Sequence, residues 1–201
     1  MLINKLTGVI FDLDNTLVSS SLNFDLIRQA IACPDGLDLL EHIDSLPLDE
    51  QKIANKIVVD HEMADAHGAE KLIGTEQLLM LLTHLKIPSA IVTRNCQQAA
   101  IVKIDNNNID IPLVLTREDH KAKPAPDALL HVAKLWEMSP KNILYVGDYL
   151  YDIQAAINAK TMSCLVSYGQ AIDYAHLATI VVDDLTELTS IISDAFVCNE
   201  L

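Results

Sequence analysis

The chain has 201 residues, of which 50% are hydrophobic, and its 28 acidic against 14 basic residues give a formal net charge of −14 at pH 7. The hydrophobic content excludes a mainly disordered chain, and the length suits one principal domain or a domain with an insertion. The negative charge disfavours binding to nucleic acid or to an anionic membrane, so we expect a small-molecule partner.

The predicted elements begin with a strand at residues 8–12, GVIFD, because this segment is short, apolar and partly β-branched. Residues 19–73 contain no convincing strand. They show three helical patterns, at residues 24–32, 36–44 and 48–68, separated by the turn-rich segments CPDG and SLPLD. Beyond residue 73, strands and helices alternate. Strands are predicted at residues 89–93, 112–116, 142–148, 162–166 and 179–183, and helices at residues 76–86, 96–105, 126–137 and 152–160.

This alternation predicts an α/β fold, in which a Rossmann-like, mainly parallel sheet of about six strands is covered by helices on both faces. Residues 19–73 are predicted to form a small α-helical cap, inserted after the first strand where the sheet presents its carboxyl edge. The core then consists of residues 1–18 and 74–201. Its last part, from about residue 183, is expected to complete a strand and a final helix.

The sequence also bears on cellular location. No segment approaches the roughly 20 consecutive apolar residues of a membrane span, and the N-terminal MLINKLTG lacks the features of a secretory signal. We therefore expect a cytoplasmic protein.

The cysteines are widely spaced and form no CxxC pair, which disfavours a zinc site or a disulfide framework. Reduced thiols are expected at Cys33, Cys96, Cys164 and Cys198.

Polar residues directly follow several of the predicted strands. In open α/β sheets, ligands bind beyond the carboxyl ends of the strands, so these residues are candidates for a functional site. Their carboxylates can hold a cation, and their hydroxyl, amide and basic groups can donate to an anion. The candidates are Asp12, Asp14 and Thr16 in DLDNT, Thr93, Arg94 and Asn95 in IVTRN, Lys123 in KPAPD, and Asp148 and Asp152 in GDYLYD.

These four segments resemble the motifs of the haloacid dehalogenase-like hydrolase superfamily, specifically its phosphatase-type members with a small helical cap, such as phosphoglycolate phosphatases. DLDNT meets the pattern DxDx[TV], IVTRN the strand that ends in Ser or Thr, KPAPD the Lys before a Pro-containing helix start, and GDYLYD the pattern GDxxxD. The motifs occur in the expected order and cover the chain from residue 8 to about residue 160. The resemblance implies a magnesium-dependent phosphatase that hydrolyses a small phosphorylated metabolite.

Matched residue by residue, the resemblance makes Asp12 the nucleophile that becomes a transient aspartyl phosphate. Asp14 becomes the general acid that protonates the leaving alcohol and then the base that activates water. Thr93 and Lys123 are expected to act in catalysis by binding the transferred phosphoryl group. The implied metal is Mg²⁺, held by Asp12, by Asp14 through its backbone carbonyl, and by Asp148.

Further roles follow from the same family resemblance or from the place of a residue in the sequence. Arg94 and Asn95 are expected to bind substrate or phosphate, although a salt bridge from Arg94 to a cap carboxylate is an alternative. Thr16 is expected to support its loop, and Asp152 to position the metal shell or Lys123. Tyr149 stands where a small residue is more usual in the family; it either narrows the entrance or packs beside it, and packing is favoured.

The acidic cluster itself indicates a cation requirement. Two like charges at ~4 Å repel by about 4 kcal/mol at an effective dielectric constant near 20. Four ionised aspartates facing a phosphate dianion are therefore unfavourable. Mg²⁺ and Lys123 together bring three positive charges, which reduces the local charge from −4 to −1.

The cap, by contrast, is hard to interpret. Its charged and imidazole side chains could contact a substrate carboxylate or sugar, but solvated positions are favoured for Arg28, His42, His61 and His67.

Other functions are compatible with parts of this pattern. A phosphomutase or phosphotransferase of the same superfamily would use the same residues and pass the phosphoryl group to a second hydroxyl. A noncatalytic receiver-like module also combines acidic residues, Thr and Lys on a parallel sheet, but it lacks DxD and a cap of some fifty residues. Dehalogenation is disfavoured because Asp14 is the mark of phosphoryl transfer in this superfamily.

Overall fold

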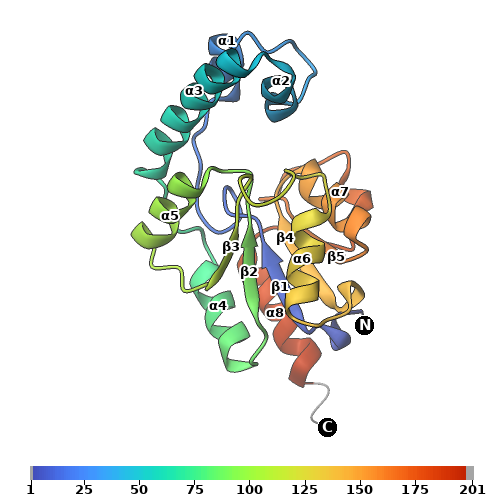
Figure 1. Cartoon of the computed structure of the whole chain (residues 1–201). Helices are drawn as coiled ribbons and strands as arrows, with labels where there is room; N and C mark the ends of the chain where they lie inside the picture. The colour runs from blue at the N-terminus through green and yellow to red at the C-terminus, as the bar shows by residue number, and fades with distance from the viewer. Residues whose placement is uncertain (1, 198–201) are drawn as a thin grey trace.

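Six parallel strands form the centre of the structure, a computed structural model that describes residues 2–197 (Figure 1). Their order in the sheet is β3-β2-β1-β4-β5-β6. Each strand lies inside the range that the sequence predicts, so the predicted α/β fold is confirmed. The strands are β1 Gly8–Phe11, β2 Ser89–Val92, β3 Leu113–Leu115, β4 Ile143–Gly147, β5 Met162–Val166 and β6 Ile180–Val182.

The strand order places three polar segments side by side. After β1 the chain builds β2 and β3 on one side, then returns to build β4 on the other side of β1. Phe11, the last residue of β1, pairs with Ile91 of β2 and with Val146 of β4. The residues that follow these three strands therefore converge at one edge of the sheet, where ligands bind in open parallel sheets.

Helices cover both faces of the sheet, and the alternation of side chains along β1 shows how. Val9 and Phe11 belong to an apolar cluster with α4, α5 and α8, whereas Ile10 belongs to a second cluster with α6 and α7. A strand that is apolar in both directions fits a parallel sheet buried on both faces. These helices are α4 Thr75–His84, α5 Gln97–Asn106, α6 Asp127–Leu135, α7 Leu150–Ala159 and α8 Leu185–Val197; the short 3₁₀ helices are η1 Leu2–Lys5, η2 Pro140–Asn142 and η3 Ala175–Leu177.

The three helices between β1 and α4 form a small cap over the carboxyl edge of the sheet (Figure 1). They are α1 Phe24–Ala30, α2 Leu39–Ser45 and α3 Leu48–Ala66. They enclose an apolar cluster of their own, which includes Ile27, Ile43 and Val58. Side chains cap two of these helices at the N-terminus, because Asn23 accepts from the backbone of α1 and Asp38 from that of α2. The helical insertion after the first strand is thus confirmed.

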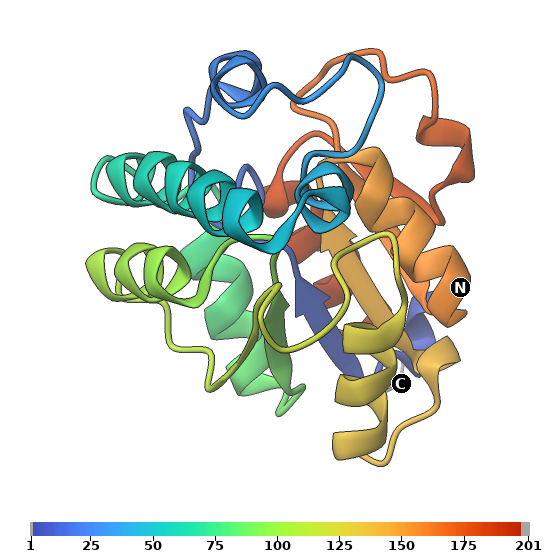
Figure 2. The same cartoon turned by 45° about the horizontal axis from the view of Figure 1, so that its top comes forward.

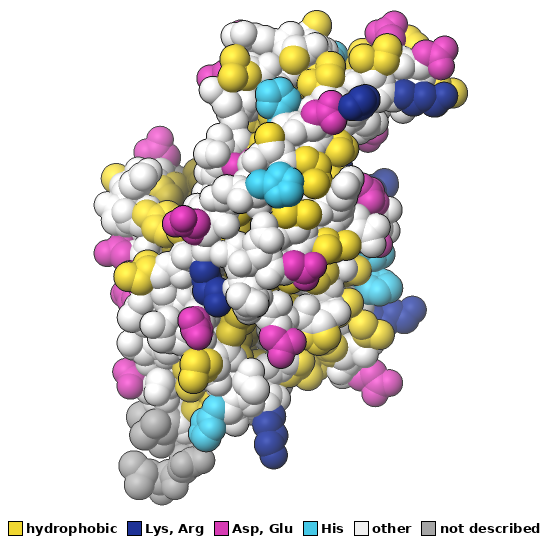
Figure 3. Space-filling model, turned by 90° about the vertical axis from the view of Figure 1, so that its left-hand side faces the viewer, with side chains coloured by type: hydrophobic (Ala, Val, Ile, Leu, Met, Phe, Trp, Pro, Cys, Tyr) yellow, Lys and Arg dark blue, Asp and Glu magenta, His cyan; other side chains and the backbone are white. Residues whose placement is uncertain are grey.

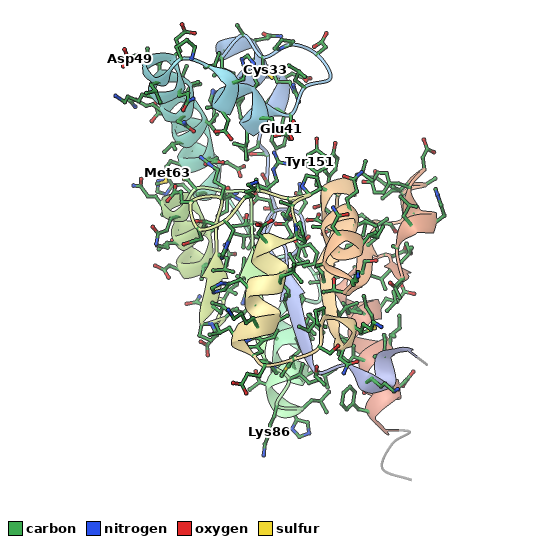
Figure 4. The ribbon with its side chains drawn as sticks, turned by 45° about the vertical axis from the view of Figure 1, so that its right-hand side comes forward. Cys33, Glu41, Asp49, Met63, Lys86 and Tyr151 are labelled. Atoms are coloured by element: carbon green, nitrogen blue, oxygen red, sulfur yellow. The ribbon has the colours of Figure 1, made fainter. Side chains whose placement is uncertain are left out.

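The long helix α3 also contacts the core. It runs alongside α5, as Figure 2 shows. The two helices meet through small buried side chains, Ala66 of α3 with Ala99 of α5 and Cys96 just before it. Met63, labelled in Figure 4, packs against this cluster. The cap is therefore fixed to the core along one helix while its other two helices extend over the sheet edge.

Surface and thiol properties complete the description. Acidic side chains are scattered over the face seen in Figure 3, with isolated basic side chains among them. Across residues 2–197, every helix is too short or too polar to cross a membrane. Cys33, Cys96 and Cys164 are buried free thiols, as expected, whereas Cys198 lies outside the described residues.

Candidate active site

A cavity of about 380 Å³ lies between the cap and the carboxyl edge of the sheet. Its floor is polar and comes from the core, whereas much of its roof is apolar and comes from the cap. The floor contains every residue of the predicted site except Thr16: Asp12, Asp14, Thr93, Arg94, Asn95, Lys123, Asp148 and Asp152. Thr16 is fully buried outside this cavity, and its hydroxyl has no hydrogen-bond partner within residues 2–197.

Lys123 is the cation at the centre of the floor. Its Nζ lies 2.7 Å from Oδ1 of Asp12 and 2.7 Å from Oδ1 of Asp152, and the residue is only 4% exposed. Asp152 is held in turn by the Tyr145 hydroxyl and the Tyr149 backbone N–H, each 3.0 Å away. Both oxygens of Asp152 therefore accept hydrogen bonds, which fits the predicted role of positioning Lys123.

A steric constraint explains why the first residue of GDYLYD is glycine. A Cβ at Gly147 would lie 2.3 Å from Cγ of Asp152, which is closer than real Cβ contacts allow. Glycine thus lets the Asp152 carboxyl group lie against the end of β4. In DLDNT, Asn15 has a φ of 51°, in the left-handed region that Asn tolerates better than most residues.

Burial and the charges of neighbouring groups shift the pKa values of the ionisable side chains on the floor. Burial, together with the charges of Asp152 and Asp14, raises the pKa of Asp12 to about 7, although Lys123 opposes this shift. Burial and the charges of Asp12 and Asp152 raise the pKa of Asp148 to about 8. Although burial opposes its charge, the pKa of Lys123 is raised by its two carboxylate partners. Ionisation of Asp12 and Asp148 is therefore unfavourable in this buried floor even with Lys123 present.

The carboxylates are close enough to share a cation. Asp12, Asp148 and Asp152 each offer an oxygen within 4.8 Å of the others. A donor set made only of oxygen atoms suits Mg²⁺. The oxygens of Asp152 already accept from Lys123, Tyr145 and Tyr149, so Asp12 and Asp148 are the side chains available as direct ligands. The Asp14 side chain is not part of this group, in keeping with its expected contribution through the backbone.

The Thr93 hydroxyl oxygen accepts two hydrogen bonds, and its hydrogen remains able to be donated. Its Oγ1 accepts from the backbone N–H of Asn95 at 3.1 Å and from Nδ2 of Asn95 at 3.0 Å. Because both bonds use the hydroxyl as an acceptor, its hydrogen can be donated to an anion in the cavity. The same Nδ2 donates to Asp14 at 3.0 Å. Asn95 thus links two of the expected catalytic residues.

A family model, described as haloacid dehalogenase-like hydrolase, matches residues 27–166 of this chain. The chain belongs to the haloacid dehalogenase-like hydrolase family. The match spans the second to fourth motifs, and the ion pair between Lys123 and Asp12 joins DLDNT to them in space.

Two curated relatives are similar to this chain in sequence, and one solved structure shares its fold. A haloacid dehalogenase-like hydrolase domain-containing protein of Arabidopsis thaliana is 32% identical over 81% of this chain and 71% of its own length. A phosphoglycolate phosphatase of Chromobacterium violaceum is 25% identical over 94% of this chain and 97% of its own. The crystal structure of a hydrolase from Pseudomonas syringae has a TM-score of 0.80 at 23% identity, covering 94% of this chain and 98% of its own.

Arg94 lines the cavity and also pairs with a carboxylate of the cap. In this haloacid dehalogenase-like chain its guanidinium pairs with Asp38 of the cap, with N–O distances of 2.6 and 2.9 Å, and donates to the backbone oxygen of Lys123. It also lies over the ring of Tyr151, 4.7 Å from the centroid. Arg94 outweighs the effect of burial and holds the pKa of Asp38 below its usual value. The salt bridge to a cap carboxylate is the alternative that the sequence left open.

The acid–base candidate Asp14 has a partner that the sequence analysis missed. Nζ of Lys103, a residue of α5, lies 2.5 Å from Oδ1 of Asp14 and 2.8 Å from Oδ2 of Asp65. Lys103 is completely buried. The available signal was its spacing, because Lys103 follows Ala99 and Ala100 by four and three residues and so lies on the buried stripe of the helix.

The roof contributes apolar side chains, one cation, and two carboxylates that pair with arginines of the core, Asp38 and Glu62. Leu22, Ile27, Leu39 and Val58 line the cavity, together with Arg28. Arg28 donates to the backbone oxygen of Pro34 and to Sγ of Cys33, and within residues 2–197 it forms no salt bridge. The cap histidines do not line the cavity: His42, His61 and His67.

The mouth of the cavity is aromatic. Tyr149 lines it and is 55% exposed, with its ring edge-on to Tyr151 at 5.3 Å between centroids. Figure 4 shows Tyr151 on the side of the core that faces the cap. The sequence analysis favours packing beside the entrance over narrowing it; Tyr149 packs against Tyr151 and also lines the cavity. A second hollow, of about 390 Å³ on another side of Asp148, has only that one charged side chain in its lining, so it lacks a cation for phosphate.

Proposed function

We propose that this chain is a magnesium-dependent phosphatase that hydrolyses a small phosphorylated metabolite through an aspartyl phosphate on Asp12. In this proposal the polypeptide consists of a catalytic core, residues 1–18 and 74–201, and a cap, residues 19–73. The observation that supports it most is the meeting of Asp12, Lys123, Thr93 and Asp148 on the floor of one cavity. Family membership and a relative that is a phosphoglycolate phosphatase support the same reaction class.

In the proposed reaction, an oxygen of Asp12 attacks phosphorus while the bond from phosphorus to the leaving oxygen breaks. Asp14 gives its proton to that oxygen, which leaves as an alcohol. Asp14 then takes a proton from water as the water attacks the aspartyl phosphate, which releases inorganic phosphate and restores Asp12. Lys123 and the Thr93 hydroxyl stabilise the charge on the phosphoryl oxygens through both steps.

Asp12 and Asp148 would hold the Mg²⁺ ion, whose two positive charges offset the repulsion between the acidic floor and a phosphate dianion. Burial and, after it, the neighbouring carboxylates raise the pKa values of both carboxyl groups to about 7 and about 8, so a bound cation would favour their ionised forms. The alternatives to hydrolysis share these residues. Transfer to a second hydroxyl would require an acceptor in the cavity, whereas hydrolysis requires only water.

The test is phosphate release from a panel of phosphorylated metabolites, with kcat/KM compared across leaving groups. We expect turnover of several small esters with a clear preference. Chelation should abolish it, Mg²⁺ should restore it, and Ca²⁺ should support little activity because its larger coordination shell misplaces the attacking carboxylate. Full activity in protein stripped of metal would contradict the proposal, as would a single stoichiometric phosphorylation without turnover.

A further inference from the structure

A chain of buried polar contacts joins the acid–base candidate to the cap. Lys103 lies between Asp14, at 2.5 Å, and Asp65 of α3, at 2.8 Å. Asp65 also accepts from the Ser20 hydroxyl at 2.8 Å, and from the backbone N–H and hydroxyl of Ser21 at 2.6 and 2.9 Å. This series of polar contacts therefore extends from the cavity through α5 to the segment that first connects the core to the cap.

This arrangement is costly for a purely structural contact. Removing an ammonium group from water carries a penalty that its ion pairs only partly return, so apolar side chains of similar size often stabilise such a position as well. Its neighbours on the buried face of α5 are Ala99, Ala100 and Ile104. A lysine there is best explained by what it contacts, and one of its two partners faces the cavity.

Two donors fix the Asp14 carboxyl group from different sides. Lys103 binds Oδ1, and Nδ2 of Asn95 binds Oδ2 at 3.0 Å. Contacts to both oxygens restrict rotation about the bond that carries the carboxyl group. Proton transfer depends steeply on such orientation, because the donor must lie within hydrogen-bond reach of the leaving oxygen.

We propose that Lys103 is a positioning residue that holds the Asp14 carboxyl group for proton transfer to the leaving group, and that Asp65 holds Lys103 in place while α3 lies against α5. The inference rests on the proposed function, because it assumes that Asp14 acts as the acid. It makes leaving-group protonation depend on the seating of the cap. Displacement of α3 removes one of the two carboxylate partners of Lys103 and loosens its hold on Asp14.

The test compares two esters of similar size in the full-length protein with Mg²⁺. Benzyl phosphate releases an alkoxide that needs a proton, whereas 4-nitrophenyl phosphate releases a stable phenolate. General acid catalysis contributes about 10²–10⁴-fold. We therefore expect Asp14→Asn to lower kcat/KM for benzyl phosphate by about that factor more than for 4-nitrophenyl phosphate. Lys103→Met should show the same selective loss at about tenfold or more, because misplacing a catalytic group by about 1 Å can cost up to ~10²-fold, and Asp65→Asn should show a smaller selective loss.

A matched control comes from a second ion pair between α3 and the core. Arg117 pairs with Glu62 of α3 at 2.5 Å, and its side chain does not contact Asp14. Arg117→Met leaves Lys103 in contact with both Asp14 and Asp65, so any loss of kcat/KM should be equal for the two esters. If Lys103→Met fails to fold, Lys103→Met combined with Asp65→Asn removes both buried charges together and takes its place in the comparison.

The outcomes separate the two ideas. Equal losses for the two esters in the folded Lys103 variant, with a selective loss in Asp14→Asn, would refute the positioning role and leave the proposed function intact. Wild-type protein that releases no phosphate from any ester would refute the proposed function and this inference with it. A selective loss in Lys103→Met, absent in Arg117→Met, is the result that supports the inference.

Discussion

The floor and the roof of the cavity are built on different principles. On the floor, Lys123, Asp12 and Asp152 are joined by ion pairs of 2.7 Å and almost fully buried. On the roof, apolar side chains from α1–α3 line the cavity together with Arg28, which has no carboxylate partner among the described residues. The two cap carboxylates there, Asp38 and Glu62, are paired with arginines of the core. Rigid, charged positioning suits a fixed chemical step, whereas an apolar surface with one cation suits selection among leaving groups. The comparison therefore separates chemistry in the core from selectivity in the cap.

The largest expected effect tests the floor. Asp12→Asn removes the nucleophile, so turnover should fall by about 10⁴-fold or more and no phosphoenzyme should form. Asp14→Asn keeps the nucleophile but lacks the acid and base. With 4-nitrophenyl phosphate it should still become phosphorylated and then dephosphorylate slowly, which rapid quench with intact-mass measurement can follow.

Folded variants are required for this comparison, and near-ultraviolet circular dichroism of both can establish that. Phosphate carried by Asp12→Asn would show that another residue is the nucleophile. A normal dephosphorylation rate in Asp14→Asn would show that water is activated elsewhere. Either result would break the assignment of chemistry to DLDNT.

A change on the roof should have a smaller and different effect. Arg28→Met removes the unpaired cation but leaves the floor untouched. We expect kcat/KM for 4-nitrophenyl phosphate to change by less than about threefold, while the preference for esters with a carboxylate in the leaving group falls by about tenfold, the value of one lost charge-assisted contact.

Lys56→Met on α3 is the matched control, because Lys56 is an exposed cap cation that pairs with Asp60 away from the cavity. It should leave the preference unchanged. A similar preference in wild type and Arg28→Met would show that the roof selects by shape and apolar contact instead.

Much of the floor could be predicted from the sequence, because the chemistry there is carried by residues that directly follow strands. Parallel strands end at the same edge, so Asp12, Thr93 and Asp148 had to converge once the strands were recognised. The contact between Asp152 and Lys123 is one of the two roles that the family resemblance implies for Asp152, and it joins the first turn of α7 to the loop before α6.

The contacts between floor and roof could not be predicted in the same way. They depend on how the cap is seated, and amphipathic spacing within α3 does not specify a partner helix. Arg94 could meet either a substrate or a cap carboxylate until Asp38 was placed 2.6 Å away. Lys103 is a single cation in a helix, which usually means a solvated side chain. Its spacing from Ala99 and Ala100 indicates a buried position, but its two carboxylate partners are known only from the structure.

The smallest expected effect is a pH-dependent gain in stability from Mg²⁺. The pKa values of Asp12 and Asp148 are raised in the folded protein to about 7 and about 8, above those of an unfolded chain. In metal-free protein the stability linked to these groups is therefore fully present below about pH 4 and is lost as pH rises through 7 and 8. Mg²⁺ binds the ionised carboxylates, so it must displace protons at low pH and offsets repulsion at high pH.

We expect the increase in Tm caused by a fixed Mg²⁺ concentration to be larger at pH 8.5 than at pH 6, by a few degrees, since about 1 kcal/mol shifts Tm by roughly 2–4 °C in a chain of this size. Thermal melts with and without Mg²⁺ at both pH values measure it. Asp148→Asn should remove most of the pH dependence, and an equal Mg²⁺ effect at both pH values in wild type would place the ion away from these two carboxylates.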